Sequence, residues 1–147
     1  MKILNNLNDV SKNPKAVTIG NFDGVHKGHQ VLINKTKDIS AENSVESLIF
    51  TFDKLPKEIF GPDTLQRLHD NRTKASILSS YKIDTLLSVD FNEIKDYEAD
   101  YFCEEILVKK LNIKYLIIGE NFKFGKDRSG DIEKLKKYHQ ENAFELS

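Results

Sequence analysis

The sequence has little cysteine, proline or tryptophan, and it lacks any long apolar run. Its 147 residues include one cysteine, three prolines and no tryptophan. The single thiol, Cys103, excludes an internal disulfide framework and suits a reducing compartment. The longest apolar stretches, such as residues 115–118, are far too short to cross a bilayer. With no export signal at the N-terminus, we expect a soluble, cytoplasmic protein without a membrane partner.

An excess of charge of one sign is also missing. The chain has 22 Lys and Arg against 23 Asp and Glu, which gives a net charge of −1. This balance provides no electrostatic footprint for nucleic acid or for an anionic membrane, so neither is expected as a partner. Small charged ligands remain compatible with it. The length suits one domain that buries its own core without disulfides or a structural metal.

Short apolar runs alternate with segments of helical spacing along the whole chain. Four runs have the length and composition of buried strands: residues 17–19, 48–52, 85–89 and 116–118. Apolar residues recur at helical spacing over residues 30–33, 73–81, 101–110 and 132–138. We therefore predict an α/β, Rossmann-like fold, in which a parallel sheet is flanked by helices and joined by right-handed crossovers.

Two glycine-rich loops follow predicted strands, at residues 20–28 and 119–130. Ligands of open α/β sheets bind at the carboxyl ends of the strands. Glycines let backbone N–H groups approach a ligand, and the helix after the first loop directs its positive end toward phosphate. An anion site is expected there.

Two histidines, His26 and His29, lie three residues apart at the start of that helix, so both side chains project from one face. Imidazoles can donate hydrogen bonds to phosphate oxygens and stabilise the charge that develops as pyrophosphate leaves. The spacing alone fits a pair of ordinary surface histidines equally well. A zinc site is less favoured, because no cysteine or third ligand is nearby.

The context of these histidines is more specific than their spacing. Residues 20–29, Gly-Asn-Phe-Asp-Gly-Val-His-Lys-Gly-His, resemble the His-x-Gly-His signature of the bacterial FAD synthetase family. The shorter motif occurs throughout a wider nucleotidyltransferase superfamily, which includes pantetheine-phosphate and nicotinamide-mononucleotide adenylyltransferases, and it also resembles that of cytidylyltransferases. Residues 118–125 with Arg128 and Gly130 resemble the second nucleotide-binding loop of the FAD synthetase family, and further similarity lies at residues 51–56 and 67–78.

The resemblance implies an FMN adenylyltransferase module of nucleotidyltransferase fold over residues 1–147. Such a module transfers AMP from MgATP to FMN, giving FAD and pyrophosphate, with Mg²⁺ as cofactor. By position, the implied catalytic residues are His26, His29 and Asn121, and Asn121 would also contact the magnesium indirectly. The implied ATP-binding residues are Gly20, Phe22, Asp23, Gly24, Gly28, Gly119, Phe122, Gly125 and Arg128. The implied flavin-binding residues are Phe52, Pro56 and Phe60.

Two of these residues also fit a structural role. Asp23 is equally suited to cap the helix that begins near His26, because Asp in a glycine-rich turn accepts backbone hydrogen bonds. Phe60, taken by itself, fits an ordinary core aromatic better than a flavin contact. Only its position in the family motif favours the flavin.

The chain departs from the family pattern in two places. Residues 54–56 are Lys-Leu-Pro where the family has Pro-His-Pro, so an imidazole is missing from the flavin side. The chain also stops at Ser147, before the family's next strand and its Ser/Thr-rich segment with arginine. We therefore expect an incomplete domain with impaired turnover, and the absence of the C-terminal riboflavin kinase module. A different acceptor, or ATP or flavin binding without turnover, are the alternatives.

Overall fold

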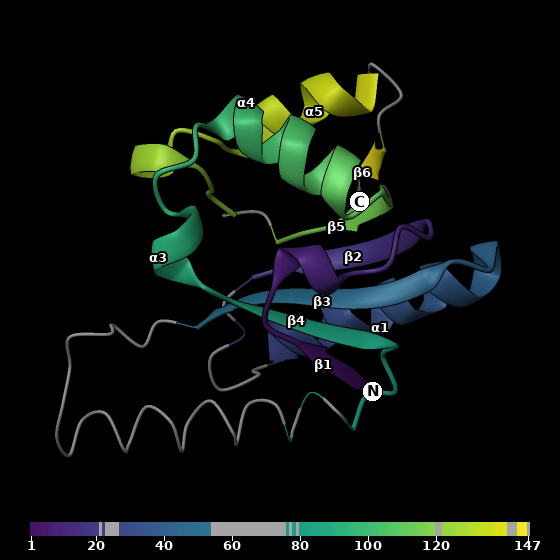
Figure 1. The fold of residues 1–147 in the computed structure, drawn as a ribbon. Helices are drawn as coiled ribbons and strands as arrows, with labels where there is room; N and C mark the ends of the chain where they lie inside the picture. The colour runs from purple at the N-terminus through teal and green to yellow at the C-terminus, as the bar shows by residue number, and fades with distance from the viewer. Residues whose placement is uncertain are drawn as a thin grey trace, which may run out of the picture.

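Six parallel strands form one sheet in the order β1-β4-β3-β2-β5-β6 (Figure 1). The computed structural model describes residues 1–20, 22, 27–53, 76, 78, 80–119, 122–140 and 144–146. Within them the strands are β1 Lys2–Leu4, β2 Lys15–Ile19, β3 Glu46–Asp53, β4 Thr85–Asp90, β5 Ile113–Ile117 and β6 Glu145–Leu146. The predicted parallel sheet is thus confirmed.

Helices cover both faces of this sheet, as the alternating pattern predicts. The long helix α1, Lys27–Asn43, lies on one face. On the opposite face lie α4, Ala99–Tyr101, its direct continuation η3, Phe102–Lys110, and α5, Ile132–Gln140 (Figure 1). Shorter helical turns are η1 Leu7–Asp9, α3 Phe91–Ile94 and η4 Lys126–Arg128.

Side chains alternate across the strands and so divide the core into two clusters. In β3, Leu48 and Phe50 belong to the larger cluster beneath η3 and α5, whereas Ile49 belongs to the smaller cluster on the α1 face with Ile33. All three β3 residues are fully buried. A strand buried on both faces shows no alternation of polarity, which is why residues 48–50 form one continuous apolar run.

The helix predicted over residues 101–110 forms, but most of it is a π-helix. The backbone N–H of Leu111 donates to the carbonyl of Ile106 at 2.9 Å, an i→i+5 bond. Phe102, Ile106 and Leu111 are all buried, and they are separated by four and five positions. This wider repeat keeps the three side chains on the sheet-facing side, which the tighter turn of an α-helix would not do.

The two ends of the described chain add edge strands. β1 is not predicted, because three residues are too few to establish a period and its side chains are mostly exposed. At the other edge of the sheet, β6 pairs with β5 through Tyr115 and Glu145. The helix predicted over residues 73–81 lies largely outside the described residues.

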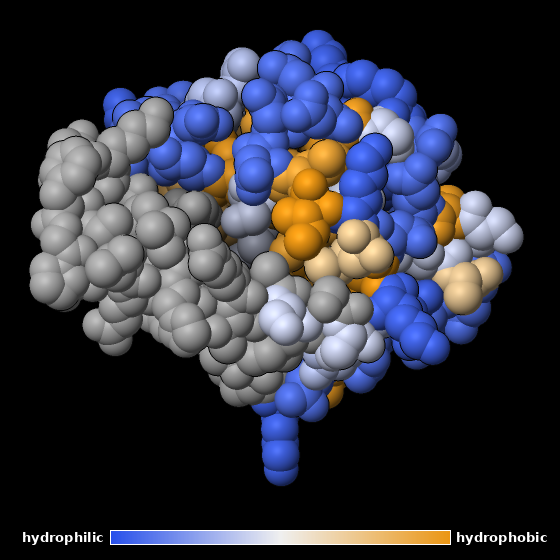
Figure 2. All heavy atoms as spheres, turned by 60° about the horizontal axis from the view of Figure 1, so that its bottom comes forward, coloured by the Kyte–Doolittle hydropathy of each residue, from blue (hydrophilic) through white to orange (hydrophobic). Residues whose placement is uncertain are grey.

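Hydrophilic side chains cover most of the coloured surface in Figure 2, and an apolar patch is visible near the middle of the view. This agrees with a sequence in which 31% of the residues are charged. Within the described ranges, no helix has the length and apolar character that crossing a membrane requires.

Candidate functional site

The two glycine-rich loops leave the sheet from neighbouring strands. β2 and β5 are adjacent and parallel, with Thr18 paired to Ile117, so Gly20 and Gly119 follow the same edge of the sheet. The chain runs from β2 into α1 on one face and from β5 toward α5 on the other (Figure 1). The strand order therefore reverses between β2 and β5, and such a switch point is where open α/β sheets bind ligands.

Gly20, the first residue of the first loop, is tightly packed. The backbone N–H of Gly20 donates to the carbonyl of Phe50 at 3.1 Å, which extends the pairing of β2 with β3 by one residue. A Cβ on Gly20 would lie 3.3 Å from Cε2 of Phe22, so the aromatic ring fills the space that a larger residue would need. Phe22 is fully buried and joins the smaller core cluster.

The first turn of α1 offers positive charge without a compensating acid. It contains Lys27, Gly28 and His29, and this described turn has no Asp or Glu. Lys27 and Gly28 are exposed, whereas His29 is half-buried against Phe22, with ring centroids 5.1 Å apart and an interplanar angle of 67°. A helix N-terminus whose first turn carries no Asp or Glu is well suited to a phosphate.

The second loop starts against the same helix. A Cβ on Gly119 would lie 3.8 Å from Cδ1 of Leu32, in the second turn of α1. The backbone N–H of Phe122 donates to the carbonyl of Gly119 at 3.2 Å, and the Phe122 ring stacks on Phe124 with centroids 5.6 Å apart. The loop from β5 is thus connected both to α1 and to the aromatic core.

The rest of the second loop is held by close packing. Gly125 has a φ of +77°, and a Cβ there would lie 2.9 Å from Cα of Ala99. At Gly130 a Cβ would overlap with Cε2 of the Phe124 ring. Both glycines therefore have a structural role in seating the loop on α4 and the core. Arg128 is exposed and has a φ of +57°.

Aromatic side chains gather at the ends of the next two strands, β3 and β4. Phe52 is half-buried near the end of β3, and its ring centroid lies 6.0 Å from that of Phe91 at an interplanar angle of 72°. Phe91, the first residue of α3, is 42% exposed. Sequence reasoning missed Phe91. Its signal was an apolar residue placed immediately after a strand, at the edge where ligands bind.

Several predicted site residues lie outside the described part of the chain: His26, Asp23, Gly24, Asn121, Pro56 and Phe60. Their predicted roles stay predictions, as do those of the described residues. Among the residues that are described, no three His, Cys, Asp or Glu side chains form a group that would hold a metal ion.

Two buried groups elsewhere are held in their protonated forms. Burial raises the pKa of the Cys103 thiol to about 12. Burial also raises the pKa of the Tyr138 hydroxyl, which donates to Asp100 at 3.0 Å and to Glu104 at 3.1 Å. Neither group would be ionised near neutral pH, so neither is suited to act as a nucleophile or base. Cys103 is a buried residue of η3, within the helix predicted over residues 101–110.

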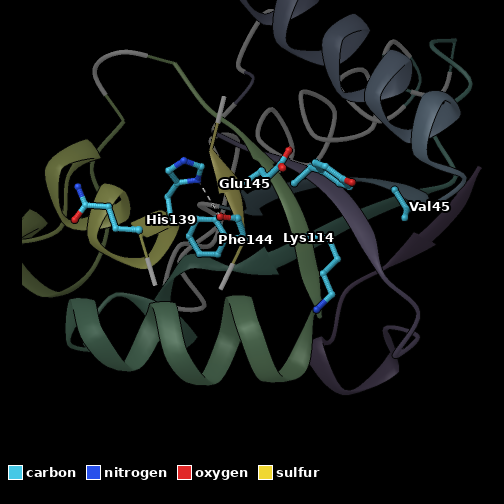
Figure 3. A pocket seen from close by; sticks show the side chains of 7 residues that line it. Val45, Lys114, His139, Phe144 and Glu145 are labelled. Carbon is cyan, nitrogen blue, oxygen red and sulfur yellow. Dashed lines mark hydrogen bonds between the residues drawn. The ribbon is translucent and has the colours of Figure 1, made fainter. Parts of the chain in front are cut away.

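Two hollows lined by described residues lie at the opposite, amino edge of the sheet. The larger one, of about 550 Å³, lies between β5, β6 and the end of α5. In Figure 3 the imidazole of His139 lies beside Phe144, and its Nδ1 is 3.2 Å from the Phe144 carbonyl oxygen. The smaller one, of about 330 Å³, is lined by residues of β1, the start of β3 and Asp84. Neither belongs to the site at the glycine loops.

Comparison with known proteins identifies the family. A family model described as FAD synthetase matches residues 8–147. This chain belongs to the FAD synthetase family. The bifunctional riboflavin kinase/FMN adenylyltransferase of Buchnera aphidicola subsp. Schizaphis graminum (strain Sg) is 37% identical over 145 residues, covering 97% of this chain and 46% of that protein. The protein of the same description from Escherichia coli (strain K12) is 32% identical over 152 residues, covering 100% and 49%.

This chain corresponds to about half of each relative and to about half of a solved structure of the same fold. The chain spans about half the length of the curated relatives just named. A crystal structure titled as a macrolide-efflux protein from Streptococcus pneumoniae superimposes with a TM-score of 0.71 and 24% identity, covering 99% of this chain and 49% of that one. At this identity the likeness shows a shared fold alone, and the fold is the one predicted.

Proposed function

We propose that this chain transfers AMP from ATP to the phosphate of FMN. An FMN phosphate oxygen bonds to the α-phosphorus of ATP, the bond from that phosphorus to the bridging oxygen breaks, and pyrophosphate leaves with the electron pair. The products are FAD and pyrophosphate. A cytoplasmic location and a correspondence of residues 1–147 to the FMN adenylyltransferase module belong to the same proposal.

The main support is the arrangement of four strand ends in the order β4-β3-β2-β5. Aromatic rings lie at the ends of β4 and β3, and glycine loops lie at the ends of β2 and β5. A flat, apolar isoalloxazine ring suits the first pair, and a triphosphate suits the second pair. FMN and ATP would then lie side by side along one edge, with their phosphates meeting near β2.

The residues of the glycine loops would bind and orient the triphosphate. His26 and His29 would donate hydrogen bonds to phosphate oxygens, and donors fixed before the reaction stabilise the charge on departing pyrophosphate. The backbones of Gly20, Phe22, Asp23, Gly24 and Gly28 would shape the pocket. Gly119, Asn121, Phe122, Gly125 and Arg128 would complete it from the second loop, with Arg128 as the exposed cation of the group.

Magnesium would be held mainly by the substrates. The described residues offer no cluster of metal-ligating side chains, which fits a Mg²⁺ ion bound through phosphate oxygens and water with Asn121 as an indirect contact. When bound, the ion would offset negative charge on the triphosphate.

The flavin would contact Phe52, with Pro56 and Phe60 as further members of the same surface. Support for Phe52 comes from its half-buried position near the end of β3 and from its contact with the exposed Phe91. A partly exposed aromatic pair provides a large apolar area for a flat ligand.

The test is to incubate this chain with FMN, ATP and Mg²⁺ and to measure FAD by chromatography and pyrophosphate by a coupled assay. His29→Ala and His26→Ala should each lower the rate by about 100-fold, the typical effect of removing one preorganised donor to developing charge. His139→Ala serves as the matched control, because this imidazole lies at the opposite edge of the sheet. Equal rates in all four proteins would refute the proposed site.

The same experiment separates the alternatives. If calorimetry detects ATP or FMN binding and no FAD forms, the chain is a binding module without turnover. If pyrophosphate forms only when FMN is replaced by a phosphopantetheine or by nicotinamide mononucleotide, the acceptor has been misassigned.

A further inference from the structure

Phe22 has an unusual backbone conformation for its residue type. Its φ is +53°, in the left-handed region that bulky side chains avoid, and the residue is fully buried. Such a conformation persists only where surrounding contacts determine it, and it is most frequent at binding and active sites. The contacts of the ring therefore indicate what the conformation achieves.

The ring lies between the start of the first loop and the first turn of α1. On one side it lies close enough to Gly20 that an added Cβ would be 3.3 Å from Cε2. On the other side it meets the imidazole of His29 in a T-shaped arrangement, with centroids 5.1 Å apart. The ring also packs with the other residues of the smaller core cluster, which include Ile33 and Ile49. The imidazole of His29 thus packs against a fully buried aromatic ring whose own neighbours restrict its motion.

We propose that Phe22 is a positioning residue that acts through His29. The proposal rests on the proposed function, in which His29 donates to the triphosphate. It also revises the role implied by resemblance, because the whole of Phe22 is buried, so the residue would shape the ATP pocket from behind His29 and not as a direct contact of the nucleotide. The ring holds the His29 imidazole at the phosphate end of α1 before substrate arrives, so less side-chain freedom is lost during the reaction.

If the Phe22 ring had only a packing role, removing it would lower the stability of the protein without acting through His29. A double-mutant cycle separates these two cases. Phe22→Leu keeps an apolar side chain and removes the contact with the imidazole, and it is combined with His29→Ala. The matched control is Phe144→Leu, which replaces a buried ring that packs on Tyr138 at the far end of the sheet.

We expect Phe22→Leu to lower kcat for FAD formation by up to about 100-fold, the cost of a misplacement of about 1 Å, with a smaller change in the KM for FMN. In the His29→Ala background the same substitution should change kcat by less than about twofold, within the usual error of additivity. Phe144→Leu should have the same effect in both backgrounds. An equal loss from Phe22→Leu in both backgrounds would overturn the proposal, as would no loss in either.

A second measurement is independent of turnover. Relaxation of the ¹³Cε1–¹H group of His29 should report a more mobile imidazole in Phe22→Leu, and an unchanged one in Phe144→Leu. Circular dichroism verifies that each variant is folded at the temperature used, and Phe22→Met replaces any Phe22→Leu protein that is not. If the unmodified chain forms no FAD, the proposed function fails. The imidazole measurement still decides the positioning role, and equal mobility with and without the ring rejects it.

Discussion

Gly125→Ala and Gly119→Ala form a matched pair, because the two glycines belong to one loop and differ in what surrounds them. At Gly125 the φ of +77° is unfavourable for any residue with a Cβ, and the new Cβ would lie 2.9 Å from the backbone Cα of Ala99. At Gly119 the φ lies outside the left-handed region, and the Cβ would be 3.8 Å from Cδ1 of Leu32, an ordinary contact.

The magnitudes follow from these two environments. For Gly125→Ala, the left-handed backbone costs roughly 1–2 kcal/mol and the overlap with Ala99 about 1–3 kcal/mol. The sum of about 2–5 kcal/mol is a large part of a total stability of about 5–15 kcal/mol. It should lower Tm by about 10 °C for a chain of this size. Gly119→Ala should instead raise stability by about 0.4–1 kcal/mol, because alanine restricts the unfolded chain without strain.

The assay is urea unfolding followed by circular dichroism, with the free energy of unfolding extrapolated to water. The opposite signs of the two changes are the informative result. If Gly125→Ala is as stable as the unmodified chain, Gly125 does not pack as closely against Ala99 of α4 as described above. If Gly119→Ala is destabilised as strongly, the second loop is packed more tightly against α1 than the structure indicates.

Two further predictions concern the flavin side and the cysteine. Phe91→Ala should raise the KM for FMN by about 10-fold, roughly the worth of one aromatic contact, and leave the KM for ATP unchanged in initial-rate assays; equal KM values for FMN would exclude Phe91 from the flavin surface. Cys103 should resist alkylation at pH 9 in the folded protein and react in urea, because its folded pKa is raised to about 12. Its contribution to stability should accordingly be complete at neutral pH and be lost as the pH rises from about 9 toward 12; rapid labelling of the folded protein would contradict this.

Much of the architecture is predictable because its signals are local. Short apolar runs and helical spacings depend on residues a few positions apart, so β2, β3, β4, β5 and α5 are found near their predicted positions. Glycine after a strand and polar residues before a helix are equally local, so the positions of both glycine-rich loops are predictable. The His-x-Gly-His context identifies the family for the same reason. Its residues occupy one continuous stretch of chain.

Other features depend on residues far apart in the chain. No local pattern indicates that β2 lies between β3 and β5, yet this order places Gly20 and Gly119 at the same edge of the sheet, after neighbouring strands. Lys15 belongs to a residue type that is normally exposed, but it is 1% exposed and donates to the carbonyls of Ser11, Asn13 and Leu111. Desolvation lowers its pKa, and those carbonyls stabilise the buried ammonium group.

By itself, then, the sequence determined the alternation of strands and helices, the two loops that follow strands, and the family. Only the tertiary structure decided that the Phe22 ring contacts His29, that Phe91 contacts Phe52, and that Gly125 lies close to Ala99. The physical reason is that a local pattern needs only neighbours along the chain. A contact between distant segments depends on how the whole core packs, and its geometry is established only when all the strands have paired in the sheet.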